Sequence, residues 1–253
     1  MIGTVLTIAL AAIAAVLAIT LHEAAHGYAA LAMGDDTARL AGRLSLNPLR
    51  HVDRVGTIIL PGILLVTQLL ALGRVAFMFG WAKPVPVAAW KFRDPRRGMM
   101  VVAAAGPAMN FGLAWLGALA LPHVAGPLPG VFGYLDWVSA RYPLMGGFLV
   151  PFIAYNLILG LFNLIPIPPL DGGRIVVGLL PLGAARAWAR MERAGIAVVL
   201  LLIFILPLAL GQFGIAFDPF RQALDTVVPW SIRVALLLSG HSIGAPVHCQ
   251  LVL

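Results

Sequence analysis

Long apolar stretches separated by short polar connections make up most of this chain. A helix that spans a bilayer needs about 20 predominantly apolar residues, and several stretches reach or approach that length. The apolar runs cover residues 2–33, 55–79, 99–121, 145–165 and 195–210. A sixth stretch, 226–239, contains Arg233 and is more typical of a helix at the membrane interface. The pattern predicts an all-α polytopic membrane protein, a bundle of transmembrane helices.

The composition agrees with this fold class. Of the 253 residues, 61% are hydrophobic and 11% are charged, and the mean hydropathy is +0.97. Because soluble domains carry about 25% charged residues, a water-soluble enzyme is excluded. The connections are shorter than the roughly 50 residues that an independent domain needs, so we expect one membrane-embedded domain over residues 1–253. With Cys249 as the only cysteine, no internal disulfide is possible.

The first two apolar runs each allow a second interpretation. Residues 2–33 contain no Lys or Arg and extend past the usual length of a signal-peptide core, which favours a membrane helix over a signal peptide. Residues 55–79 are interrupted by Pro61-Gly62 and again by Gly73. This segment either spans the bilayer or is re-entrant, and a re-entrant segment is tolerated where protein covers its backbone.

The first run contains the sequence His22-Glu23-Ala24-Ala25-His26. On a helix the two histidines lie one turn apart on the same face, so both imidazoles can bind one metal ion. Glu23 lies beside them, in a position to activate water. An unpaired charge in hydrocarbon costs about 2.5–3.5 kcal/mol, so a function has to offset it. The alternative is a polar contact in which these side chains bond across a helix bundle.

A third ligand is needed, because zinc hydrolases usually bind the metal through three protein side chains. The best candidate is Asp171, which follows a proline-rich break after the fourth run and precedes Gly172 and Gly173. These glycines allow close backbone packing, although an Asp in this context is also typical of a turn or a helix cap. The remaining histidines lie in connections or the tail, where solvated or interfacial side chains are expected: His51, His123, His241 and His248.

Two motifs resemble those of the site-2 protease family of intramembrane zinc metalloproteases. They are His22-Glu23-x-x-His26 and Asn163-x-x-Pro166-x-Pro168-x-Leu170-Asp171-Gly172. Further similar segments are 42–48, 80–86 and Ala105-Gly106-Pro107-x-x-Asn110. The resemblance covers residues 20–175 and is to the compact bacterial type without PDZ or CBS domains. Residues 176–253 show no diagnostic match, and we expect an additional helix or helices and a tail there.

The resemblance implies a role for each motif residue. One Zn²⁺ per chain would be held by His22, His26 and Asp171, with Glu23 as the general base and Asn163 holding the substrate backbone or the oxyanion. Substrates would be single-span membrane proteins or signal-peptide remnants, hydrolysed within or near their transmembrane segments in regulated intramembrane proteolysis.

Substrate binding and alternative functions follow from the same residues. We expect residues 34–48 to provide an edge strand, a short β element near the active site, that pairs with an unwound substrate. One alternative is a membrane metal-binding or transport protein that uses the His and Asp side chains without hydrolysis. Another is a non-catalytic scaffold that binds membrane helices. Hydrolysis is favoured because only a protease needs Glu23 beside His22 and Asn163 before Asp171.

The metal site and the basic residues predict a topology. A metal ion shared by His26 and Asp171 requires the first and fourth runs to have the same direction, which favours a re-entrant 55–79. Fourteen basic residues then lie on the metal side and Arg141 alone lies opposite. The fourteen are Arg39, Arg43, Arg50, Arg54, Arg74, Lys83, Lys91, Arg93, Arg96, Arg97, Arg174, Arg186, Arg190 and Arg193. The positive-inside rule places this side in the cytoplasm.

The basic balance also bears on partners and location. The formal net charge is +7, but the basic residues lie between apolar runs and form no basic stripe. We therefore assign them to topology and to contacts with the lipid bilayer, and expect no nucleic-acid partner. Together with the resemblance, this predicts a multi-pass protein of the bacterial plasma membrane with its active site towards the cytoplasm.

Overall fold

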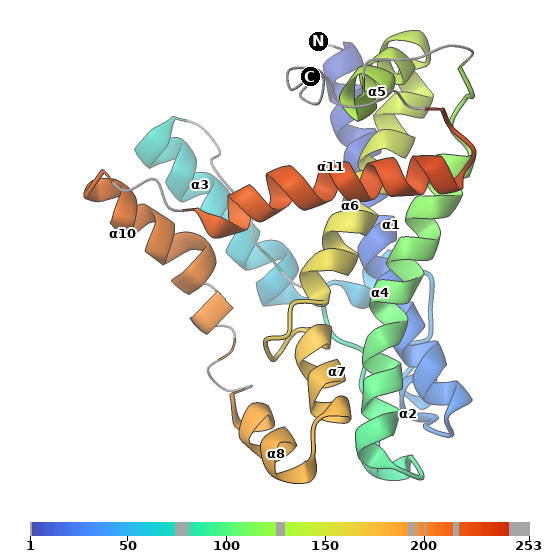
Figure 1. The fold of residues 1–253 in the computed structure, drawn as a ribbon, viewed down its shortest axis with the longest axis vertical. Helices are drawn as coiled ribbons and strands as arrows, with labels where there is room; N and C mark the ends of the chain where they lie inside the picture. Colours follow the sequence, from blue (N-terminus) through green and yellow to red (C-terminus); the bar gives the residue numbers. More distant parts are fainter. Residues whose placement is uncertain are drawn as a thin grey trace, which may run out of the picture.

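Three long helices form the centre of the molecule in the computed structural model (Figure 1). The structure describes residues 2–73, 80, 82–124, 130–191, 195, 197–199, 201–214 and 218–242. The central helices are α1 (Ile2–Ala32), α4 (Pro95–Leu119) and α6 (Pro143–Asn163). Each is long and apolar enough to cross a membrane. The predicted all-α polytopic membrane fold is confirmed.

The direction of the helices agrees with the predicted topology. His26 of α1 contacts the Val102 carbonyl of α4, and the Ala18 carbonyl contacts Asn110, so α1 and α4 are antiparallel. Helix α6 returns antiparallel to α4 and therefore has the same direction as α1 (Figure 1). The prediction that the first and fourth apolar runs share a direction is confirmed, and the end of α6 lies near the His-bearing part of α1.

Small residues bring the central helices close together. A Cβ at Gly117 would lie 2.9 Å from Ile153 of α6, and one at Gly160 would lie 3.1 Å from Phe111 of α4. Ala114 is fully buried between the same helices. Such small residues are typical of helix contacts in membranes, where close van der Waals packing replaces the hydrophobic effect. Large apolar side chains are consequently free to point outward to lipid.

Shorter helices surround this centre. They are α2 (Thr37–Leu40), α3 (Leu60–Leu72), α5 (Gly130–Arg141), α7 (Asp171–Leu179), α8 (Leu182–Arg190), α10 (Leu206–Gln212) and α11 (Pro219–Leu238). Helix α11 lies across α4 and α6 (Figure 1) and packs Ile232 and Leu236 into their core. It is long enough to span a membrane but is not among the three helices that are also apolar enough, which agrees with the predicted interfacial character of 226–239.

Some positions considered above lie outside the described residues. The apolar run at 195–210 falls partly on them, and its described portion includes a π-helical segment, Leu201–Ile205, that leads into α10. The described residues also exclude five positions named above or within the segments considered: Arg74, Trp81, Arg193, His248 and Cys249.

The second apolar run is less broken than expected. A π-helical segment, Arg54–Ile59, continues directly into α3, so the chain stays helical through Pro61-Gly62 and the expected break there is wrong. The helix changes from π to α geometry next to Pro61, whose ring and missing N–H disturb the hydrogen-bond ladder of a helix. The expected break at Gly73 is confirmed, because this glycine ends α3 with φ 64°. The apolar helix Arg54–Leu70 is shorter than the three membrane-length helices, and its re-entrant placement stays a prediction.

The expected β element near the site is also wrong for the part of the chain that the structure describes, which contains no strand. Residues 34–48 form turns and the short helix α2 instead. The carboxylate of Asp35 accepts hydrogen bonds from the backbone N–H and the hydroxyl of Thr37. These local bonds stabilise a helical turn and compete with an extended backbone.

Candidate metal centre

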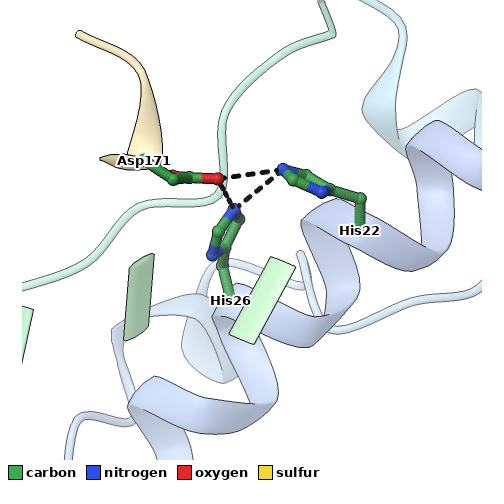
Figure 2. Close-up of side chains that lie close together, drawn as sticks. All are labelled: His22, His26 and Asp171. Carbon is green, nitrogen blue, oxygen red and sulfur yellow. Dashed lines mark hydrogen bonds and ion pairs between the residues drawn. The ribbon is translucent and has the colours of Figure 1, made fainter. Parts of the chain in front are cut away.

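Three side chains of metal-binding type converge beside the central helices. Figure 2 shows His22 and His26 on one face of α1 and Asp171 pointing at both. The Nε2 atoms of His22 and His26 lie 3.2 and 3.3 Å from Asp171 Oδ2, and 3.1 Å from each other. His22 is 4% exposed and Asp171 is 7% exposed. The structure thus brings together all three metal ligands that the sequence and the family resemblance predict.

The second ring nitrogen of each histidine makes a hydrogen bond that fixes its protonation. His26 Nδ1 lies 2.7 Å from the Val102 carbonyl oxygen, which can only accept, so Nδ1 carries the ring proton and donates a hydrogen bond to that oxygen. His22 Nδ1 lies 2.6 Å from Asn110 Oδ1 and donates in the same way. Each Nε2 therefore presents a lone pair to the centre of the triangle, which is the tautomer a metal-binding histidine needs.

The spacing and chemistry of these atoms fit zinc. Two imidazole lone pairs and a carboxylate oxygen at 3.1–3.3 Å repel one another unless a positive charge lies among them. Buried Asp171 Oδ2 has no hydrogen-bond donor among the described residues. Zinc bonds of about 2.0–2.1 Å in a tetrahedron place neighbouring ligand atoms roughly 3.3 Å apart. Among the described side chains, these three residues form a group that could hold a metal ion, because their ligand atoms all lie within 4.8 Å of one another.

Asp171 reaches the histidines because the chain folds tightly after α6. It is the first residue of α7, and the two glycines after it lie directly against the proline-rich loop. A Cβ on Gly172 would overlap the backbone of residues 164–165, and one on Gly173 would overlap the backbone of Pro168. The close packing expected of Gly172 and Gly173 is confirmed, and it holds the carboxylate at the level of the histidines.

Gly106 of α4 lies directly against both imidazoles. A Cβ at this position would be 2.5 Å from His26 Cε1 and 2.6 Å from His22 Cε1. Real Cβ atoms essentially never approach another heavy atom closer than 3.0 Å. Only glycine therefore lets α4 close over the histidine pair, and the backbone of α4 forms one wall of the centre.

Glu23 contacts a connecting segment that runs past the site. Its Oε2 accepts a hydrogen bond from the Val85 N–H at 3.2 Å. Val85 is buried and belongs to residues 82–88, which we call the strap and which have no regular secondary structure. Gly27, one turn along α1, leaves room for it, because a Cβ there would lie 3.1 Å from Val85 Cγ1. The backbone of the strap thereby orients the carboxylate next to the histidines.

A buried carboxylate anchors the other end of the strap. Asp35 is 0% exposed, and its Oδ2 accepts a hydrogen bond from the Ala88 N–H at 2.6 Å. The Lys91 ammonium group lies 3.4 Å from Oδ1. Burial raises the pKa of Asp35, but hydrogen bonds from Thr37, Ala88 and Lys91 outweigh it and hold the pKa below its ordinary value. The charged form of Asp35 therefore fastens the strap.

Asn163 makes a hydrogen bond within its own helix. It is the last residue of α6, and its side-chain amide donates to the Leu159 carbonyl oxygen at 3.0 Å. Within the described part of the chain, the amide is thus held by its own helix and not by Glu23 or the three ligands. The amide nitrogen carries a second hydrogen that this bond does not use.

The other described histidines lie outside the metal cluster, as expected, but the expectation that they are solvated is wrong for His51 and His241, which are buried. His51 is buried, and its Nε2 lies 2.8 Å from the Ser45 carbonyl oxygen. His123 and His241 stack on each other, with ring centroids 4.2 Å apart, where the connection after α4 meets the end of α11. Burial lowers the pKa of the His241 imidazole below its ordinary value.

Comparisons with known proteins decide the family. A protein named "Putative zinc metalloprotease YwhC" from Bacillus subtilis is 38% identical over 195 residues, which cover 76% of this chain and 78% of the relative. The chain belongs to peptidase family M50, the site-2 protease family. The family model for M50 matches residues 117–206, a range that includes Asn163 and Asp171. The resemblance to this family is confirmed, and with it the assignment to zinc metalloproteases.

Other proteins named as putative zinc metalloproteases are similar over different shares of their length. Rip2 of Mycobacterium tuberculosis, also named a "Putative zinc metalloprotease", is 29% identical over 194 residues, which cover 76% of this chain and 65% of Rip2. FN1322 of Fusobacterium nucleatum, with the same description, is 35% identical over 105 residues, or 40% of this chain and 30% of the relative. No solved structure gives a significant match.

The sequence alone left some residues of this M50 site without a role. Gly106 and Asn110 belong to a segment that resembles the family, but only the structure shows that they contact the histidines. Val102 contributes a backbone carbonyl, which leaves no trace in the identity of the residue. Asn156, which contacts Asn110, has no local sequence signal except its polarity inside an apolar run.

Proposed function

We propose that this M50 member is an intramembrane zinc metalloprotease that hydrolyses peptide bonds within or near the transmembrane segments of membrane proteins. One zinc ion per chain is held by His22, His26 and Asp171, and Glu23 is the general base. The observation that carries this proposal is the convergence of two histidine Nε2 atoms and a carboxylate oxygen at 3.1–3.3 Å beside three membrane-length helices.

The residues of the chain divide the chemistry between them. Bound zinc supplies a Lewis acid that polarises a substrate carbonyl and makes water more acidic. Glu23 takes a proton from the attacking water on its carboxylate and passes it to the leaving amine. The Val85 N–H keeps this carboxylate in place through its bond to Oε2. Asn163 donates a hydrogen bond to the substrate backbone or to the developing oxyanion through the amide hydrogen that its bond to the Leu159 carbonyl leaves unused.

The membrane setting favours a particular class of substrate. A peptide bond inside a transmembrane helix is already hydrogen-bonded within its own helix and must unwind before water can attack it. Single-span membrane proteins and signal-peptide remnants offer one such helix without a surrounding bundle, so they are the proposed substrates. Their cleavage is the chemical step of regulated intramembrane proteolysis.

Water needs a polar route to a site beside membrane-length helices. A cavity of about 380 Å³ borders the proline-rich loop at Pro168 and Gly173, next to Asp171. Arg96 and Arg174 are among its lining residues. The lining does not include His22, His26 or Asp171, so the cavity marks only an opening beside the loop that carries Asp171, and we propose that water enters from this basic side. The positive-inside rule makes that side cytoplasmic, in the plasma membrane of a bacterial cell.

The test compares membrane proteomes of null cells that carry the wild-type protein or Glu23→Gln. The variant is expected to accumulate a few single-span proteins or stubs while its zinc content stays unchanged, because the base is lost and the ligands remain. Asp225→Asn on α11 serves as a matched control, since that carboxylate is exposed and pairs with Arg221 far from the site. Identical proteomes with an expressed, zinc-loaded wild type would contradict hydrolysis and favour the metal-binding or transport alternative.

A further inference from the structure

Two asparagine side chains are buried in the centre of the helix bundle. Asn110 of α4 and Asn156 of α6 are both 0% exposed. Burial of an amide without hydrogen bonds costs several kcal/mol in an apolar environment, so such residues persist where they are fully bonded. Asn110 Nδ2 donates to Asn156 Oδ1 at 2.8 Å, and Asn110 Oδ1 accepts from His22 Nδ1 at 2.6 Å. The pair therefore connects α6 to the metal centre on α1.

A backbone carbonyl determines which group donates and which accepts at each step of this chain of hydrogen bonds. Asn156 lies 2.8 Å from the Phe152 carbonyl oxygen, which can only accept, so the nitrogen of the Asn156 amide faces Phe152. Its oxygen then faces Asn110, and the Asn110 nitrogen must donate to it. The Asn110 oxygen is left for His22, whose Nδ1 must carry the proton. A second carbonyl, that of Ala18, lies 3.4 Å from the same Asn110 nitrogen and favours the same orientation.

The two histidines are thus fixed in different ways. His26 donates directly to a backbone carbonyl, which holds its tautomer without help from any side chain. His22 depends on Asn110, and the orientation of the Asn110 amide depends on Asn156. If the Asn110 nitrogen faced His22, its N–H would point at the Nδ1 proton and repel it. The neutral imidazole would then carry its proton on Nε2 and would lose the lone pair that binds a metal there.

We propose that Asn156 is a positioning residue that sets the tautomer and direction of His22 through Asn110, and thereby the zinc affinity of the site. The proposal rests on the metal site of the proposed function. It makes the zinc affinity depend on the packing of α6 against α4, although no side chain of α6 touches His22 in this chain of bonds. Partners of metal-bound histidines typically change metal affinity or activity by about 10–100-fold when they are removed.

The test measures the zinc dissociation constant of the purified full chain in detergent, by competition with a chromophoric chelator. Asn156→Leu and Asn110→Leu are each expected to weaken zinc binding by about 10–100-fold. The double variant is expected to bind zinc no more weakly than Asn110→Leu alone, because Asn156 acts through Asn110. Asn156→Asp is expected to restore most of the affinity, since a neutral carboxyl group offers one acceptor to Asn110 and one donor to Phe152.

A purely structural role for Asn156 gives a different result. In that case thermal unfolding shows lower stability for Asn156→Leu, the folded protein binds zinc as tightly as the wild type, and the proposal is overturned. Losses that add in the double variant overturn it as well. If the Leu variant does not fold, the Asp variant decides, because it is expected to keep most of the wild-type affinity and a loss of 10-fold or more contradicts the proposal.

Two further variants serve as a control for the loss of a buried polar group and as a test of the metal site itself. Ser239→Ala removes another buried polar group, which donates to the carbonyl one turn earlier in α11, and is expected to leave zinc affinity unchanged. Unchanged zinc affinity in His22→Ala would show that the metal site itself is wrong. If His22→Ala loses zinc and Asn156→Leu does not, only the positioning role fails.

Discussion

The contact between α4 and the histidine pair leads to the sharpest prediction, the effect of Gly106→Ala. The added Cβ would lie 2.5 Å from His26 Cε1, and ordinary van der Waals contact begins at 3.4 Å, so something must move by about 0.9 Å. The imidazoles cannot turn aside without breaking their bonds to Val102 and Asn110. Metal sites tolerate displacements of only about 0.2 Å in their ligand distances. The required movement is several times larger.

The expected result is a loss of zinc affinity without a loss of the helix. We expect the zinc dissociation constant of Gly106→Ala to rise by at least about 10–100-fold, the range found when the support of a ligand is removed. This corresponds to roughly 1.4–2.7 kcal/mol of binding free energy. The alanine itself favours the helix by about 1 kcal/mol relative to glycine, so poor helix formation would not explain the loss.

Gly112→Ala on the same helix is the matched control. A Cβ at Gly112 meets no atom within 4 Å, so this variant makes the same chemical change in open space. Chelator competition on both purified proteins is expected to show wild-type affinity for Gly112→Ala and weak binding for Gly106→Ala. Equal affinities in the two variants would refute the reasoning that α4 has to close over the histidines.

Three further predictions concern the ligands, the substrate contact and the strap. Asp171→Ala should weaken zinc binding by more than about 100-fold, because it removes a ligand and not merely its support, whereas His51→Ala should bind zinc normally in the same competition assay. Asn163→Ala should slow cleavage of an accumulating substrate by about 100–1000-fold with zinc content unchanged, and full activity would exclude it as an oxyanion donor. Because the pKa of folded Asp35 lies below its ordinary value of about 3.9, its stabilising contribution is present above about pH 4 and is lost as the pH falls through the folded pKa. The difference in melting temperature between the wild type and Asp35→Asn, measured with a metal chelator present, should therefore shrink at acid pH; a constant difference would contradict the tethering role.

Local patterns in the sequence were sufficient for the three long apolar helices and for the motif on α1. Apolar runs of membrane length and the four-residue spacing of His22 and His26 depend only on residues close together in the chain. The choice of Asp171 needed more, namely the absence of a third ligand elsewhere and the resemblance to a known family. The direction of α6 relative to α1 followed from requiring one metal ion to join these groups.

Where the predictions were wrong, the competing interaction was specific to the fold. The expected strand in residues 34–48 gave way to a helical turn, because Asp35 bonds Thr37 and is itself fixed by the strap. The expected break at Pro61 did not occur, because the helix passes through this position by changing from π to α geometry. Alternation of residue types and the presence of proline did not reveal these contexts.

The sequence by itself therefore determined the membrane class, the three long apolar helices and the histidine pair of the site, since each depends on composition or short-range periodicity. Only the tertiary structure decided how the ligands are held. The bond between His22 and Asn110 joins residues 88 positions apart, and that between Asn110 and Asn156 joins residues 46 apart. A buried amide or a glycine in an apolar helix looks the same in the sequence whether it faces lipid or an imidazole. The physical difference appears only when three helices pack closely enough for one backbone to touch both histidines.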